Sequence, residues 1–130
     1  MFLTQFLMSE TPDQWPEESD NIDAQKVAIR TLNDNLRCRL EGGRVMMTQG
    51  VNALADETLH RVLKAVQTFD DFSEGNDPYG THEFGMIEVD EERVMFKIDA
   101  YDKNFEYGSS DPADPEVTRR VMTILLASEY

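Results

Sequence analysis

The 130-residue sequence has a single cysteine, Cys38, and no apolar run long enough to cross a membrane. One cysteine excludes an intrachain disulfide and a cysteine-based zinc site. The apolar stretch FLTQFL near the start has no basic flank, because Lys26 is the first lysine or arginine, so a secretory signal is not predicted. We therefore expect a soluble, cytoplasmic protein that has no contact with a membrane.

The recognised catalytic signatures are also missing. The sequence contains no GxSxG, no GxxxxGK[ST], no HExxH, no CxxC, and no GxGxxG that opens a helix after a strand. Cys38 is flanked by Arg37 and Arg39 on a predicted helix, and we do not expect it to act as a nucleophile. No catalytic residue, cofactor or metal ligand is assigned from these patterns, and a non-enzyme is favoured.

Basic residues are scarce: 12 Lys plus Arg stand against 26 Asp plus Glu, for a net charge of −14. Fifteen of the acids lie within residues 67–116, together with only three bases, Arg93, Lys97 and Lys103. Such a field repels nucleic acid and membrane phosphates and attracts a basic protein surface or divalent cations. Solubility is the simpler interpretation. If the charge serves binding, the predicted partner-binding acids are Asp70, Asp71, Glu74, Glu88, Asp90, Glu91, Glu92, Asp111 and Asp114.

The chain is expected to form one domain behind a short arm. Residues 1–20 are acidic and interrupted by Pro12 and Pro16, which predicts a flexible arm. Residues 21–130 are too few for two separate cores, so a single domain is predicted there.

Hydrophobic periodicity predicts the elements of this domain. Leucines at helical spacing followed by the EGG turn predict a helix over about 22–40, and a second apolar stripe predicts a helix that Asp56 caps. RVMMT at 44–48 suits a strand, and FGMIEV and RVMFKIDAY predict a hairpin. A third helix that runs almost to the terminus is predicted to start at Asp114, Pro115 and Glu116. The predicted fold is α+β, with three helices packed on a small, mainly antiparallel three-stranded sheet in the order αβαββα.

The loop GNDPYGTHEFG, residues 75–85, has the residues of a tight turn, since Asp77 can accept backbone N–H bonds and Gly80 tolerates a positive φ. We expect it to meet a polar cluster beside the leucine stripe of the first helix. Either a polar pocket or an internal hydrogen-bonded network results. The predicted members are Asn33, Asp34, Arg37, Asp77, Tyr79, His82 and Asp99.

Two alternatives stay open at these loops. Asp77, His82 and Asp99 form an oxygen-rich set that would suit Mg²⁺ or Mn²⁺, although a histidine bonded to a loop carbonyl is commoner. Arg119 and Arg120 follow the acidic SSDPADPE stretch, so they either pair with its acids or bind an anion. Pairing is favoured, because the acids are close in sequence.

Five strings of the sequence together carry a resemblance: LNDNLR, GGRVMMTQGV, NDPYGTHEFG, KIDAYD and SSDPADPEVTRRVMTILLASEY. Over residues 27–130 the chain resembles a bacterial domain-of-unknown-function family of small acidic proteins, frequent on plasmids, phages and other mobile elements. The resemblance implies no activity. It implies a genomic setting in which small proteins act against host defence or in maintenance of the element.

Three hypotheses follow. The first is a small acidic binding protein, an inhibitor whose acids mimic nucleic acid and occupy a basic groove of a host nucleic-acid-binding defence complex. The second is a metal-dependent enzyme that uses Asp77 and His82. The third is a structural or regulatory subunit without catalysis. The charge distribution and the missing catalytic signatures favour the first.

Overall fold

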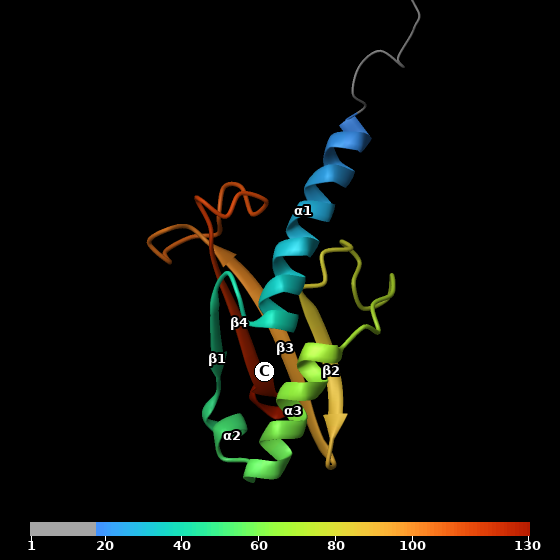
Figure 1. The fold of residues 1–130 in the computed structure, drawn as a ribbon, viewed down its shortest axis with the longest axis vertical. Helices are drawn as coiled ribbons and strands as arrows, with labels where there is room; N and C mark the ends of the chain where they lie inside the picture. Colours follow the sequence, from blue (N-terminus) through green and yellow to red (C-terminus); the bar gives the residue numbers. More distant parts are fainter. Residues whose placement is uncertain (1–17) are drawn as a thin grey trace, which may run out of the picture.

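The computed structural model describes residues 18–130, so almost all of the arm predicted at 1–20 lies outside the described residues. The elements are α1 (Glu18–Arg39), β1 (Arg44–Met47), α2 (Gln49–Asn52), α3 (Asp56–Thr68), β2 (Phe84–Val89), β3 (Glu92–Tyr101), β4 (Arg119–Leu126) and the 3₁₀ turn η2 (Ala127–Glu129) (Figure 1). Within this part of the chain, no helix is long and apolar enough to span a bilayer.

The four strands form one mixed sheet in the order β1-β4-β3-β2. β1 runs parallel to β4, from the pair Arg44 and Val121 onward, whereas β4 pairs antiparallel with β3 and β3 with β2. The β2–β3 hairpin turns at Asp90 and Glu91, both with positive φ (53° and 69°). Positive φ at both central turn residues is typical of a type I′ turn, which suits the twist of paired strands.

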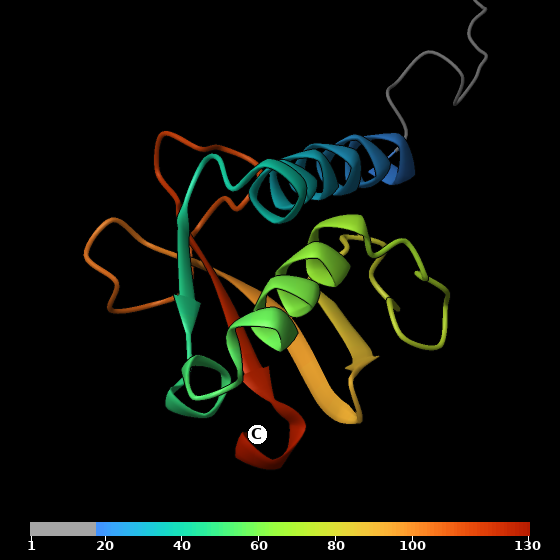
Figure 2. The ribbon, with the colours of Figure 1, turned by 60° about the horizontal axis from the view of Figure 1, so that its bottom comes forward.

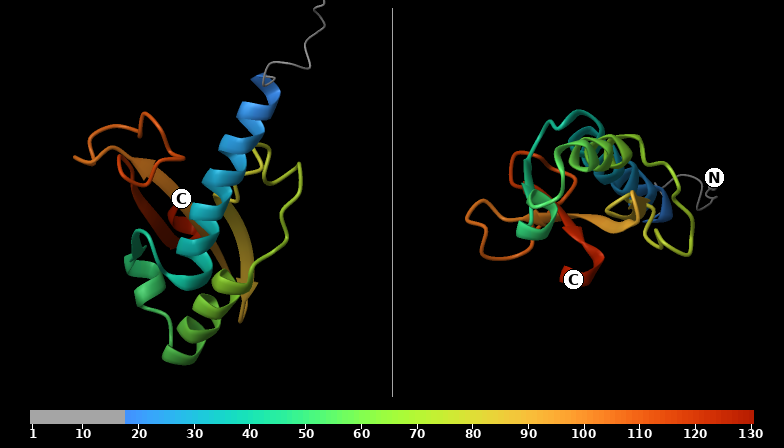
Figure 3. Two further views of the ribbon diagram at one scale, coloured as in Figure 1. Left: turned by 45° about the horizontal axis from the view of Figure 1, so that its top comes forward. Right: turned by 90° about the horizontal axis from the view of Figure 1, so that it is seen from below.

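Helices α1 and α3 lie on the same side of this sheet (Figures 2 and 3). Strand residues two apart point to the same face, and Val94, Phe96 and Ile98 of β3 are all buried towards the helices. The core that they form with the other elements consists of Leu36, Val51, Val62, Val66, Val94, Phe96, Ile98, Met122 and Ile124. The alternate residues of β3, such as Lys97 and Asp99, therefore lie on the opposite face of the sheet.

The predicted fold class is wrong in its last element and in its sheet. Residues 119–126 form β4, a central strand, and the sheet has four strands with one parallel pair. The apolar residues of RRVMTILL are close enough together to fit a helix stripe, but Met122 and Ile124 alternate into the core as strand residues do. Pairing with β1 and β3 decides whether this segment forms a helix or a strand. The local spacing of apolar residues does not indicate such pairing.

The predicted start of the third helix is a turn. The Asp114 carboxylate accepts the backbone N–H of Glu116 at 2.9 Å, and the Asp114 carbonyl accepts that of Val117 at 3.3 Å. Asp and Asn side chains bond in this way to the backbone two residues on, which holds a turn without requiring a helix. The two predicted helices before β2 are present as α1 and α3, although Ala55, and not Asp56, is the N-cap of α3. The short helix α2 was not predicted.

Gly85 of β2 lies against two aromatic rings. A Cβ at this position would meet ring carbons of Phe96 and, at 2.9 Å, of Phe69. These two rings are themselves packed edge to face, with centroids 5.4 Å apart. The absence of a side chain at Gly85 therefore allows the sheet to approach the end of α3.

We expect Gly85→Ala to lower the free energy of unfolding by about 1–3 kcal/mol, because an added methyl forces a packed core to shift. Gly75→Ala is the matched control, since its Cβ would approach only the Ser73 hydroxyl at 3.8 Å. Urea unfolding monitored by circular dichroism measures both variants. Equal stability of Gly85→Ala and the parent would contradict the packing described above.

Glu129 of η2 connects the segment after β4 to α2 through hydrogen bonds. Its carboxylate accepts the Thr48 hydroxyl at 2.5 Å, the Gly50 N–H at 2.9 Å and the Leu126 N–H at 2.8 Å. The hydrogen bond from Thr48, followed by that from Leu126, lowers the pKa of Glu129 from its usual value. The ionised form is therefore favoured in the folded protein.

The lowered pKa of Glu129 makes the free energy of unfolding depend on pH. Because the folded pKa lies below the unfolded one, the contribution is fully present above the unfolded pKa of a glutamate, about 4.3, and is lost as pH falls through the folded pKa. We expect Glu129→Gln to melt at a lower temperature than the parent at pH 7, with the difference shrinking at pH 3. Melting curves across this pH range test it, and a difference that is constant with pH would contradict it.

Candidate functional site

A buried polar cluster joins α1 to the loop that precedes β2. Asn33 is 3% exposed and donates from its side-chain amide to the Thr81 carbonyl at 2.8 Å. One turn earlier, Arg30 donates from Nε to the Gly80 carbonyl, also at 2.8 Å. Because a buried amide must find partners for its polar atoms, the position of this loop is fixed by the face of α1 that carries Asn33.

His82 lies at the centre of this cluster. Its Nδ1 is 2.9 Å from the Asp34 carboxylate, and its Nε2 is 3.8 Å from that of Asp77. The ring is stacked on Phe72, with centroids 3.8 Å apart and planes at 6°. His82 has a left-handed φ of 59°, and its N–H donates to the Asp77 side chain at 3.1 Å. Both ring nitrogens thus face carboxylates, which suits a histidine that fixes the loop.

Arg37 extends the same cluster into the core. It is 4% exposed and donates from one terminal nitrogen to Asp34 at 2.8 Å. Its guanidinium lies over the rings of Phe72 and Phe96, at 5.1 and 5.7 Å from their centroids. Cation–π contacts of this kind stabilise a guanidinium whose hydration is removed. Its Nε is buried without a hydrogen-bond partner among the residues described.

The structure brings together most of the predicted polar cluster. Asn33, Asp34, Arg37, Asp77 and His82 join in the hydrogen bonds described above. Tyr79 is separate, since it is 66% exposed. Asp99 is separate too: it lies on the sheet face away from the helices and pairs with Lys97 at 2.9 Å. The predicted turn is confirmed, because Asp77 accepts the backbone N–H of His82 and Gly80 has a φ of 71°.

The ligand set Asp77, His82 and Asp99 is not assembled, because the sheet separates Asp99 from the other two residues. Across residues 22–130, no three His, Cys, Asp or Glu side chains gather where they could hold a metal ion. The arrangement that remains is one imidazole between two carboxylates. Both of its nitrogens already lie near acceptors, so proton transfer to a substrate would require this network to open.

The predicted partner-binding acids lie in three places. Asp70, Asp71 and Glu74 follow α3, Glu88 to Glu92 form the β2–β3 hairpin, and Asp111 and Asp114 lie between β3 and β4. β3 has ten residues and separates the hairpin from the last group. At about 3.3 Å per residue, these two groups are ~30 Å apart. The nine acids therefore do not share one continuous face.

Two of the hairpin acids have basic partners. Asp90 accepts from Arg61 at 2.5 Å and from the Thr58 hydroxyl at 2.8 Å, and these hydrogen bonds, that from Arg61 foremost, lower the pKa of Asp90. Glu88 lies 3.5 Å from Arg93. Among the residues described, the other seven predicted acids form no ion pair with a lysine or arginine. Three of these seven acids lie in the loop after α3, two in the loop between β3 and β4, and two in the hairpin, so the loop after α3 has the most unneutralised acids.

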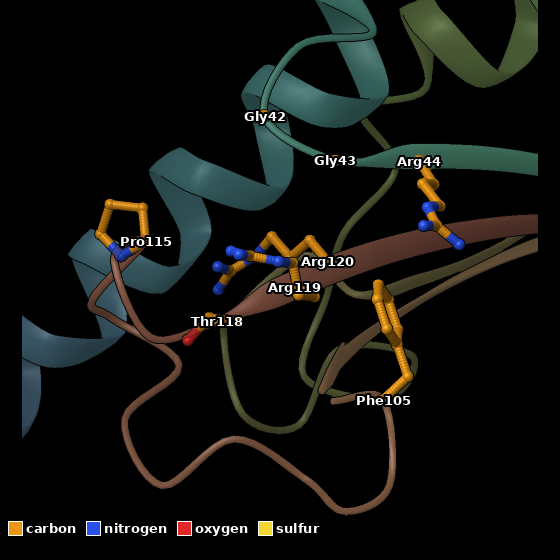
Figure 4. A pocket seen from close by; sticks show the side chains of 8 residues that line it. All are labelled: Gly42, Gly43, Arg44, Phe105, Pro115, Thr118, Arg119 and Arg120. Carbon is orange, nitrogen blue, oxygen red and sulfur yellow. The ribbon is translucent and has the colours of Figure 1, made fainter. Parts of the chain in front are cut away.

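A second feature is a pocket that sequence reasoning did not predict as a unit (Figure 4). It has a volume of about 450 Å³ and lies where the α1–β1 turn, the loop after β3 and the start of β4 meet. The lining residues are Gly42, Gly43, Arg44, Phe105, Pro115, Thr118, Arg119 and Arg120. Three arginines thus line one pocket without any acid in its wall. The expected pairing of Arg119 and Arg120 with the preceding acids is not formed.

Arg120 links this pocket to the polar cluster. It is 4% exposed, donates from Nε to the Asn33 side chain at 2.7 Å, and donates from a terminal nitrogen to the Pro112 carbonyl at 2.6 Å. Burial lowers the pKa of the Arg120 guanidinium. The pocket was missed because its lining comes from three separate segments. The available signal was the pair of adjacent arginines, for which anion binding had been the less favoured interpretation.

Fold and site together define an α+β domain with a mixed four-stranded sheet, a buried polar cluster under one loop, and an arginine-lined pocket. The chain belongs to the DUF3768 family, a family of proteins of unknown function, whose model matches residues 47–129. The match covers well over half of the chain and begins later than residue 27, where the resemblance seen in the sequence starts. No curated protein and no solved structure gives a match.

We expect Asp34→Ala to lower the free energy of unfolding by about 2 kcal/mol, because it removes the only carboxylate within ion-pairing distance of the buried Arg37 in the described structure. Asp23→Ala, an exposed change on the same helix, should stay within about 0.5 kcal/mol of the parent. Urea unfolding measures both. Equal effects of the two substitutions would show that the cluster does not stabilise the loop.

Proposed function

We propose that this protein is a non-catalytic binding protein that contacts a basic surface of another protein through its acidic loops. The observation that carries the proposal is the composition of the loop at 70–83, which has five acids and no lysine or arginine. Asp70, Asp71 and Glu74 of this loop are exposed and form no ion pair within the described structure. An unneutralised exposed field of one sign attracts a partner of the opposite sign.

The loop is held in place, which favours binding. Asn76 accepts the Ser73 N–H at 2.7 Å and donates to the Asp71 carbonyl at 2.7 Å. The contacts of Asn33 and His82 fix its second half to α1. An ordered loop loses less conformational entropy on association than a mobile one, so its charges can contribute more of their attraction to affinity.

A second acidic loop lies beside α1 at the same end of the molecule. The loop between β3 and β4 lies on one side of α1 and the loop at 70–83 on the other (Figure 1). Asp111 and Asp114 of the former each accept a backbone N–H of their own turns. Their charges are therefore fixed in position as well. The two loops form the acidic surface that we assign to the partner, and the hairpin acids at the opposite end are not part of it.

A more specific proposal concerns the identity of the partner: it is a nucleic-acid-binding component of a host defence system. It is supported by the resemblance to mobile-element proteins and by the net charge of −14. Mimicry along one continuous face of nine acids is not supported by their placement in three groups. We therefore propose a narrower contact in which the two loops occupy a basic groove that otherwise holds nucleic acid.

Charge reversal of the loop tests the proposal. We expect Asp70→Lys with Glu74→Lys to weaken the captured partner's binding by roughly tenfold or more, and the loss to shrink as salt increases. Glu91→Lys with Glu92→Lys is the matched control, because it gives the same net charge at the opposite end of the sheet. Partners captured from a bacterial extract at low salt are identified by mass spectrometry, and their affinities for the three proteins are then compared.

Equal weakening by the two pairs would contradict the assigned surface, as would affinity that is indifferent to both salt and charge reversal. The proposal that the partner binds nucleic acid in the same groove is tested by competition with duplex DNA. A partner that releases the protein as DNA is added supports occupation of a nucleic-acid groove. A partner that binds both together contradicts it.

A further inference from the structure

The arginine pocket has a charge opposite to that of the protein as a whole. Arg44, Arg119 and Arg120 are three of only 12 lysines and arginines in the chain, and no Asp or Glu lines the pocket with them. Its volume of about 450 Å³ lies within the range of ~300–1,000 Å³ that is usual for small-molecule sites. Its wall includes Phe105, Pro115 and Thr118 of the β3–β4 loop, which also carries Asp111 and Asp114 of the acidic surface proposed for the partner.

Arg120 is the inner arginine of the pocket, and its contacts leave its charge uncompensated. Its two hydrogen-bond acceptors, the Asn33 amide oxygen and the Pro112 carbonyl, are both neutral. Within residues 22–130, no carboxylate lies close enough to form an ion pair with it. Burial of a cation without a counter-charge is unfavourable. An anion bound beside it would offset this cost.

Arg44 and Arg119 are the outer arginines. Both are exposed, and neither forms an ion pair with another described residue. The guanidinium of Arg44 lies over the ring of Phe105, 4.6 Å from its centroid. Phe105 is itself placed by the loop after β3, in which the Asp102 side chain accepts the N–H groups of Asn104 and Glu106 at 3.1 and 3.0 Å. Contacts thus orient at least one of the two outer guanidinium groups.

The nearest acids in the sequence do not neutralise these arginines. Asp111 and Asp114 precede β4, and each accepts a backbone N–H within its own turn, at 3.2 and 2.9 Å. Thr118 of the pocket wall already donates its hydroxyl to the Asp111 carbonyl at 2.9 Å. The arginines therefore set the charge inside the pocket.

We propose that this pocket binds the phosphate groups of a small phosphorylated ligand. Guanidinium groups present paired N–H donors that match phosphate oxygens, and three of them around one pocket suit a group with several anionic oxygens better than a single carboxylate. The ligand is small, because the acids of the β3–β4 loop beside the pocket and the net charge of −14 repel a nucleic-acid duplex. Inorganic pyrophosphate and the diphosphate of a nucleotide share the recognised chemistry.

Isothermal titration calorimetry of the full chain in a phosphate-free buffer at low salt tests the proposal. The titrants are pyrophosphate, ADP and, as a carboxylate comparison, citrate. We expect one site for pyrophosphate or ADP, and Arg44→Gln and Arg119→Gln should each weaken it by roughly tenfold. Arg93→Gln is the matched control, since this exposed arginine lies on β3 beside the hairpin and its substitution makes the same charge change.

Loss of binding in the two pocket variants alone, with melting temperatures unchanged, supports the site. Tighter binding of ADP than of pyrophosphate supports a nucleotide as the source of the phosphates, and equal binding supports the diphosphate group alone. No heat from either titrant at millimolar concentration would overturn the proposal. So would citrate binding as tightly as both phosphates, or an equal loss in Arg93→Gln, since these outcomes indicate general attraction of anions.

Discussion

The hydrogen bond from Arg120 to Asn33 is the contact on which the functional end of this molecule depends. It joins β4, a central strand of the sheet, to α1 at a place where both side chains are buried. The amide of Asn33 then donates to Thr81, so the same residue fixes the loop before β2. In a low-dielectric interior such a bond is strong when both partners are satisfied, and the loss of either leaves a buried polar group without a partner.

Helices α1 and α3 were predictable because each carries its apolar residues at helical spacing along a single segment. β4 was not, because its placement depends on pairing with β1 and β3, which are far away in sequence. The same distinction applies to the sites. The polar cluster was largely predicted, since most of its members come from one helix and one loop. The pocket was not, because Arg44, Phe105 and Arg119 come from segments that only the sheet brings together.

The charge of the whole chain is a poor guide to the charge at any one place in it. A net charge of −14 predicts a single acidic surface only if the acids share a face, and the length of β3 keeps the hairpin acids away from the others. Acids that bond to their own turns also leave neighbouring arginines without partners, as at Asp111 and Asp114. A basic pocket can therefore form within a strongly acidic protein.

Arg120 belongs both to the buried polar cluster and to the wall of the pocket. Because its Nε holds Asn33, a change at Arg120 would disturb the loop at 70–83 and the pocket together. Arg44 and Arg119 are exposed and contact neither Asn33 nor that loop through any hydrogen bond of the described structure. The outer arginines thus report on the pocket alone, and acids such as Asp70 and Glu74 report on the loop. The shared buried residues report on the stability that both features require.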